Sequence, residues 1–153
     1  MSKIVHNMAS FLILPILIYG LYLIMHGHST PGGGFQGGAV LASGVALLIV
    51  AFGSHSTHKS VKVPHLPILM SIGLLIFIGL ALGGMFQSTF FHNFLVGSSV
   101  FGHIPPPGPN PGEMSGGGVI PFISLVIGLK VLAGLSAILL VMALASSRKE
   151  IEE

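Results

Sequence analysis

Four long apolar runs constrain this chain more than any other feature of its sequence. A segment of about 20 apolar residues crosses the roughly 30 Å hydrocarbon core of a bilayer as a helix. A helix also satisfies its backbone hydrogen bonds internally, as that environment requires. We therefore predict an all-α integral membrane protein with four transmembrane helices, in a single membrane domain over residues 1–153. The predicted spans are Met8–Met25, Phe35–Phe52, Leu66–Phe86 and Ile120–Ala145.

The composition excludes most soluble functions. Hydrophobic residues make up 52% of the chain and charged residues 7%, whereas a soluble domain carries about a quarter charged residues. Apart from Lys130, the few basic residues are scattered at the ends of the runs, and they form no patch, so nucleic-acid binding has no support. Because the chain has no cysteine, thiolate chemistry and iron–sulfur clusters are excluded.

The basic residues near the span ends predict the orientation. The first connector, residues 26–34, and the third, residues 87–119, contain no Lys or Arg. Cytoplasmic loops carry the excess of basic residues in membrane proteins. We therefore expect a multi-pass protein of the plasma membrane, with both termini and the 53–64 loop in the cytoplasm. The basic residues behind this prediction are Lys3, Lys59, Lys62, Arg148 and Lys149.

A glycine-rich motif opens the second span. Glycine adopts backbone angles closed to other residues and lets a second backbone approach closely, so the motif predicts a tight turn and then a helix crossing through Gly37 and Gly38. A phosphate-binding loop is the alternative, but the Lys-Ser/Thr of that pattern is missing. The residues of this packing and re-entry motif are His26, His28, Pro31, Gly32, Gly33, Gly34, Gly37 and Gly38.

The string Gly-His-x-x-Pro-Gly-Gly-Gly-Phe-x-Gly-Gly, placed after a first span, resembles the MnhB/MrpB family. Those proteins are the MnhB and MrpB subunits of multisubunit Mrp-type Na⁺/H⁺ antiporters, and similar subunits occur in archaeal membrane-bound hydrogenases and related respiratory complexes. The resemblance implies a non-catalytic subunit that binds no cofactor. It also implies other membrane subunits as partners, with Na⁺ and H⁺ as the transported ions.

Lys130 is the one charged residue inside a predicted span. It follows Ile120 by ten residues, which places it about 15 Å deep. A charge at that depth must face protein or water and find a partner. Three interpretations stay open: a pair across a subunit interface, a position on a proton or cation path, or a side chain that reaches an interface.

Other chemistry finds little support in the sequence. Eight histidines lie mostly at span ends with no carboxylate nearby in sequence, so we predict no metal site. A small intramembrane enzyme would need convergent polar groups.

The leading hypothesis is a small antiporter subunit that supports assembly and lines an ion path, in a stand-alone antiporter or a hydrogenase-like complex. The alternatives are an intramembrane enzyme and an autonomous homo-oligomeric channel.

The predicted topology can be tested by cysteine labelling, because the chain has no cysteine of its own. Single cysteines at Ser60 and Asn110 should differ in intact cells: an impermeant maleimide should label position 110 and leave position 60 unlabelled until the cells are permeabilised. Labelling of both positions, or the reverse pattern, contradicts the orientation.

Overall fold

Four long helices build the computed structural model, which describes residues 2–29, 31–54, 56–57, 64–99, 102–103 and 116–152. They are α1 (Lys3–Met25), α2 (Gly33–Phe52), α4 (His65–Gly83) and α5 (Ile120–Glu152), and the short 3-10 helix η1 (Gly84–Phe86) extends α4. All four are long and apolar enough to cross a membrane. The predicted all-helical, four-span, multi-pass membrane fold is confirmed.

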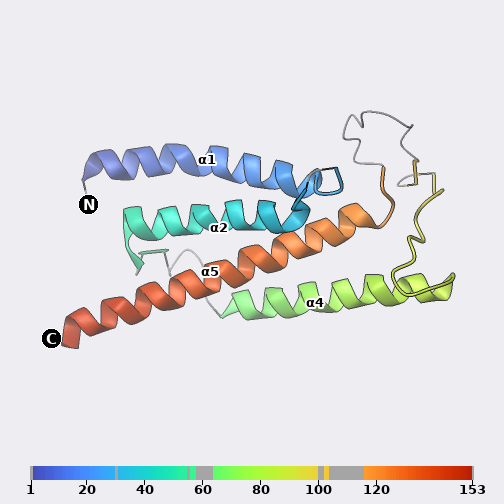
Figure 1. The fold of residues 1–153 in the computed structure, drawn as a ribbon. Coiled ribbons are helices and arrows are strands. Elements are labelled where there is room, and N and C mark those ends of the chain that lie inside the picture. Colours follow the sequence, from blue (N-terminus) through green and yellow to red (C-terminus); the bar gives the residue numbers. More distant parts are fainter. Residues whose placement is uncertain are drawn as a thin grey trace.

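The helices lie side by side in the order α1, α2, α5, α4 (Figure 1). In the part of the chain that the structure describes, α5 packs on α2 with one side and on α4 with another, while α4 packs on no other long helix. Both termini lie at one end of the bundle, here called the terminal end (Figure 1). The turn from α1 to α2 and the connection from α4 to α5 lie at the opposite end, called the loop end.

The helix bounds differ from the predicted spans mainly at the two termini. Helix α1 begins at Lys3 because the Ser2 side chain caps it, accepting a hydrogen bond of 3.4 Å from the Val5 N–H. Helix α5 continues to Glu152, beyond the apolar run that predicted its end at Ala145. Both extensions carry polar residues that a helix tolerates and a hydropathy pattern does not mark. The 58–63 and 104–115 segments, with Lys59, Lys62 and both labelling positions, lie outside the described residues.

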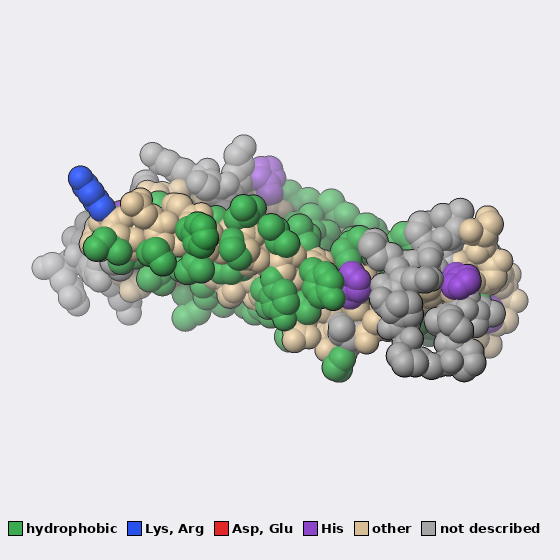
Figure 2. Space-filling view, turned by 90° about the horizontal axis from the view of Figure 1, so that it is seen from above, with side chains coloured by type: hydrophobic (Ala, Val, Ile, Leu, Met, Phe, Trp, Pro, Cys, Tyr) green, Lys and Arg blue, Asp and Glu red, His purple; other side chains and the backbone are tan. Residues whose placement is uncertain are grey.

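The outer surface of the bundle is strongly apolar. Large side chains such as Phe11 and Leu75 are each 70% exposed, and Met142 is 66% exposed. Figure 2 shows hydrophobic side chains along much of the face that it presents. Soluble proteins rarely expose apolar surfaces of this extent to water, so these faces contact lipid or other membrane subunits.

Asn93 joins the connection after α4 to the start of α5. Its side-chain Nδ2 donates to the Gly117 carbonyl at 2.9 Å, and its Oδ1 accepts from the Val119 N–H at 2.8 Å. The two bonds satisfy backbone groups just before Ile120, where a helix has no internal partners for its first N–H groups. Asn93 thereby fixes the loop end of α5 against the end of α4.

We predict that Asn93→Ala lowers the thermal unfolding midpoint in detergent. Each lost hydrogen bond leaves a backbone group without its partner, at a cost of about 1–3 kcal/mol. Asn7→Ala is the matched control, because Asn7 is exposed on α1. Equal midpoints for the two variants would show that the Asn93 bonds contribute nothing measurable.

Candidate functional site

The turn between α1 and α2 depends on glycine at two positions. Gly32 has φ 88° and Gly33 has φ 40°, a left-handed region that disfavours side chains. A Cβ at Gly33 would also lie 2.6 Å from the Gly27 carbonyl oxygen. The chain therefore re-enters the bundle within a few residues after α1 ends at Met25.

One face of α2 lies against α1 at Gly37. A Cβ at Gly37 would lie 2.5 Å from Ile24 Cγ1 and 2.8 Å from the Gly20 carbonyl oxygen. Gly20 is equally confined from the α1 side, where a Cβ would lie 2.6 Å from Leu41 Cδ2. The two helices touch through backbone, which only residues without a side chain allow.

A second face of α2 lies against α5 at Gly34 and Gly38. A Cβ at Gly38 would lie 2.5 Å from the Gly128 carbonyl oxygen and 2.8 Å from Val131 Cβ, while one at Gly34 would overlap the Ser124 carbonyl oxygen. Gly34 and Gly38 are spaced as a Gly-x-x-x-Gly pair, which lies on one face of a helix. The glycines of α2 thus serve two neighbours on two faces.

The counterpart residues on α1 and α5 were not predicted. These counterparts are Gly20 on α1, and Ser124 and Gly128 on α5. Ile24 of α1 reaches both other helices, because its side chain lies where a Cβ at Gly37 or at Gly128 would be. A lone glycine in an apolar helix costs about 1 kcal/mol relative to Ala. Because of that cost, a glycine within an apolar helix indicates a close contact with another helix. The sequence does not show which helix each glycine faces.

The polar members of the motif lie at its edge. His26 ends α1, where its ring stacks on Tyr22 at 4.3 Å between centroids and its Nδ1 lies 3.2 Å from the Tyr22 carbonyl oxygen. His28 is half-buried near Gly117, and Pro31 is exposed. These three residues frame the turn, and the contacts between helices come from the glycines.

Lys130 lies on the other side of α5, against α4. A Cβ at Gly73 would lie 2.6 Å from Lys130 Cγ, so this glycine leaves room for the lysine chain. The ammonium nitrogen lies 5.8 Å from the centre of the Phe77 ring. Lys130 is half-buried, and the structure does not bring it together with the glycine motif.

The contact with Phe77 does not offset the cost of the charge. A cation near an aromatic face gains about 0.5–2 kcal/mol, whereas a lysine at the centre of a membrane helix costs about 2.5–3.5 kcal/mol. The four acidic residues of the sequence are Glu113, Glu150, Glu152 and Glu153, none of them within a helix segment identified as a span. The four spans therefore contain no acidic side chain that could pair with the ammonium group.

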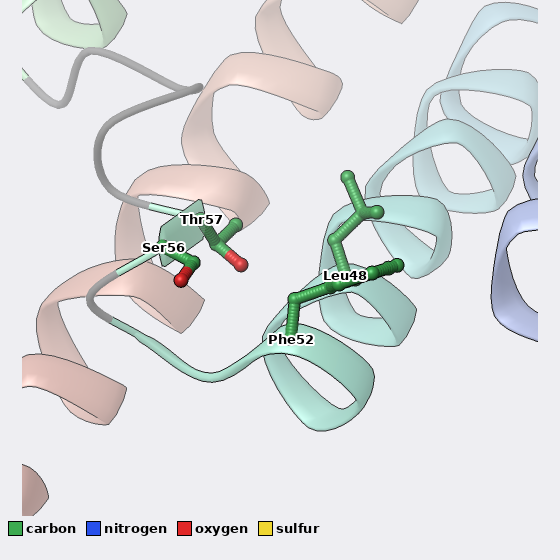
Figure 3. Close-up of a pocket in the computed structure, with 4 residues that line it drawn as sticks. All are labelled: Leu48, Phe52, Ser56 and Thr57. Carbon is green, nitrogen blue, oxygen red and sulfur yellow. The ribbon is translucent and has the colours of Figure 1, made fainter. Parts of the chain in front are cut away.

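A pocket of about 270 Å³ lies at the terminal end of α2. Leu48 and Phe52 face Ser56 and Thr57 across it (Figure 3). The Thr57 hydroxyl donates to the Gly53 carbonyl at 2.9 Å, so this group serves the local turn. Within the described ranges, no three metal-ligating side chains gather in one place.

Comparison with known families agrees with this architecture. A family model described as a domain related to the MnhB subunit of Na⁺/H⁺ antiporter matches residues 4–137. The chain belongs to the MnhB family. The match includes the MnhB-family glycine motif and Lys130, and it ends within α5.

Relatives of this MnhB-family chain come from archaea and bacteria. The uncharacterized protein MJ1307 of Methanocaldococcus jannaschii is 39% identical over 124 residues, which cover 76% of this chain and 43% of that protein. A Na⁺/H⁺ antiporter subunit of Alkalihalophilus pseudofirmus is 33% identical over 82 residues, covering 54% of this chain and 56% of the relative. The putative antiporter subunit mnhB2 of Staphylococcus haemolyticus is 29% identical, covering 67% and 70%. The chain thus spans about half the length of two of these relatives.

We predict that Gly38→Leu separates α2 from α5. The new side chain would overlap the backbone of Gly128, which cannot change rotamer as a side chain can. The loss of stability should therefore exceed the roughly 1–3 kcal/mol typical of an overpacked core. The thermal midpoint in detergent should fall, and membrane partners should be lost on purification.

Gly79→Leu is the matched control for that substitution. Gly79 also lies in an apolar helix, but a Cβ there would meet nothing within 4 Å. Gly79→Leu should leave the midpoint unchanged or raise it slightly, because Leu favours a helix more than Gly does. A folded Gly38→Leu complex that retains its partners and loses only transport would instead assign the motif a direct functional role.

Proposed function

We propose that this chain is a membrane subunit of an Mrp-type multisubunit Na⁺/H⁺ antiporter, multi-pass in the plasma membrane with both termini in the cytoplasm. The observation that carries the proposal is the MnhB family match over residues 4–137. The A. pseudofirmus relative, whose name is that of a Na⁺/H⁺ antiporter subunit, supports it. Na⁺ and H⁺ are then the transported ions of the complex.

The subunit is non-catalytic and contributes to assembly. Residues that carry protons or cations through a membrane are ionisable groups within the hydrocarbon region, and Lys130 is the one charged residue inside the four predicted apolar spans. The glycine crossing holds α1, α2 and α5 together without polar chemistry. The main path for Na⁺ and H⁺ therefore lies in partner subunits, with this chain beside it.

The complex around this subunit is either a stand-alone antiporter or a hydrogenase-like respiratory complex with an antiporter module. Both settings require the same four-helix subunit among other membrane chains. The chains that co-purify with it separate the two settings, because a hydrogenase-like complex brings metal-binding redox subunits and a stand-alone antiporter does not.

We predict that a tagged chain, expressed from its own genome and purified in mild detergent, brings down several other membrane subunits. Mass spectrometry should identify antiporter subunits among them, and deletion of the chain should abolish Na⁺-dependent proton movement in inverted membrane vesicles. Complementation with the wild-type chain is the control. A chain that purifies alone or as a homo-oligomer would contradict the proposal and support the enzyme or channel alternatives.

A further inference from the structure

Lys130 directs its charge along α4 toward the loop end of the bundle. Its Cγ lies beside Gly73, and its Nζ lies beside Phe77, one helical turn further along α4. Side chains on a helix lean toward the N-terminus of that helix, and the N-terminus of α5 is at the loop end (Figure 1). The position of the ammonium group is thus fixed by two helices.

Gly73 makes this placement possible. A Cβ at that position would lie 2.6 Å from Lys130 Cγ and 3.3 Å from Cδ. The lysine chain therefore occupies a notch in the surface of α4, with Phe77 above it. We call Gly73, Phe77 and Lys130 the lysine notch.

The Phe91 ring packs edge-on against Phe77, with 5.6 Å between the ring centroids, and the rest of the described chain leaves the edges of α4 around the lysine notch exposed. Within the described residues, α5 is the one long helix that α4 contacts. The residues on both edges of α4 at this level are exposed: Ile72 at 46%, Leu74 at 45%, Ile76 at 45% and Ile78 at 44%. A further transmembrane helix has room to pack on either edge.

We propose that the lysine notch receives an Asp or Glu side chain from a transmembrane helix of another subunit, which packs on an edge of α4. This inference rests on the proposed function, because it requires a partner subunit. Charge complementarity selects the occupant, since an ammonium group at this depth needs an anion close by. A partner helix that supplies this anion is also held at one position along α4, because its acidic side chain has to lie beside Lys130.

Two other occupants fit the notch poorly. Lipid phosphates lie at the membrane surface, about 15 Å from a residue ten positions below Ile120, which is beyond the length of a lysine side chain. A second copy of this chain offers no suitable acid, because its glutamates, at positions 113, 150, 152 and 153, lie outside its spans. The anion therefore comes from a different chain.

Lys130→Met tests the pair, because it preserves the bulk of the side chain and removes the charge. The tagged full-length chain in its native complex should then recover at least about tenfold less of the partner subunit, since an acid left without its counter-charge is costly in a membrane. Lys130→Arg keeps the charge and should stay within about twofold of wild type. Lys3→Met is the matched control, because Lys3 is exposed at the terminal end.

The partner is identified by photo-crosslinking from positions 76 and 78, one on each edge of α4. One of the two positions should crosslink to a helix of another subunit. Each Asp or Glu on that helix is then changed to Asn or Gln in the Lys130→Met background. One such change should restore recovery of the partner, because the neutral pair leaves no isolated charge.

Several results would overturn the inference. Normal recovery with Lys130→Met excludes the pair, and a loss of exchange with normal recovery assigns Lys130 to an ion path instead. Failure of every neutralising change to restore recovery also excludes it. The proposed function fails separately, when the wild-type chain brings down no antiporter subunits. The amount of each variant in the membrane is measured in the same experiment. If Lys130→Met lowers the amount of the chain itself, and no neutralising change on the partner restores that amount, the result also counts against the pair.

Discussion

Direct contact between helix backbones at the glycines of α2 is the interaction on which this structure depends. In a bilayer, lipid tails are as apolar as leucine, so hydrophobicity does not drive helices together and close packing has to do so. Gly37 brings α2 onto α1, and Gly34 and Gly38 bring it onto α5. The left-handed backbone at Gly32 and Gly33 turns the chain back into the bundle at the start of α2.

The bundle divides into a tightly packed part and an open part. Three helices meet where Ile24 of α1 fills the space beside Gly37 and Gly128, and their separation is set by backbone. Among the described helices, α4 contacts this group only through α5, and Lys130 lies in that contact. The packed part suits a structural role, and the open part exposes the apolar edges of α4 beside Lys130.

The sequence predicted the spans well because length and the absence of charge are sufficient signals for a helix in a membrane. It missed the helix start at Lys3 and the end at Glu152 because polar residues outside the hydrocarbon continue a helix without altering the apolar pattern. It also singled out the glycine run and Lys130. The roles assigned to these residues remain predictions.

The contacts of these residues were beyond sequence reasoning. Gly73 and Phe77 surround Lys130 only because α4 lies beside α5, and a helix period does not show which neighbour a face meets. Asn93 bonds to groups 24 and 26 residues further along the chain. No local sequence pattern connects positions so far apart, and five prolines between positions 105 and 111 lie between them in the sequence.

The length of α5 has a consequence for the membrane around it. Its apolar part, Ile120–Ser147, has 28 residues and measures about 42 Å at 1.5 Å per residue, which exceeds the roughly 30 Å of hydrocarbon. A helix with such a mismatch tilts, and α5 runs obliquely to α2 in Figure 1. Within the described residues, α5 is the one long helix that α4 contacts. The oblique course of α5 therefore also sets where α4 lies relative to α1 and α2.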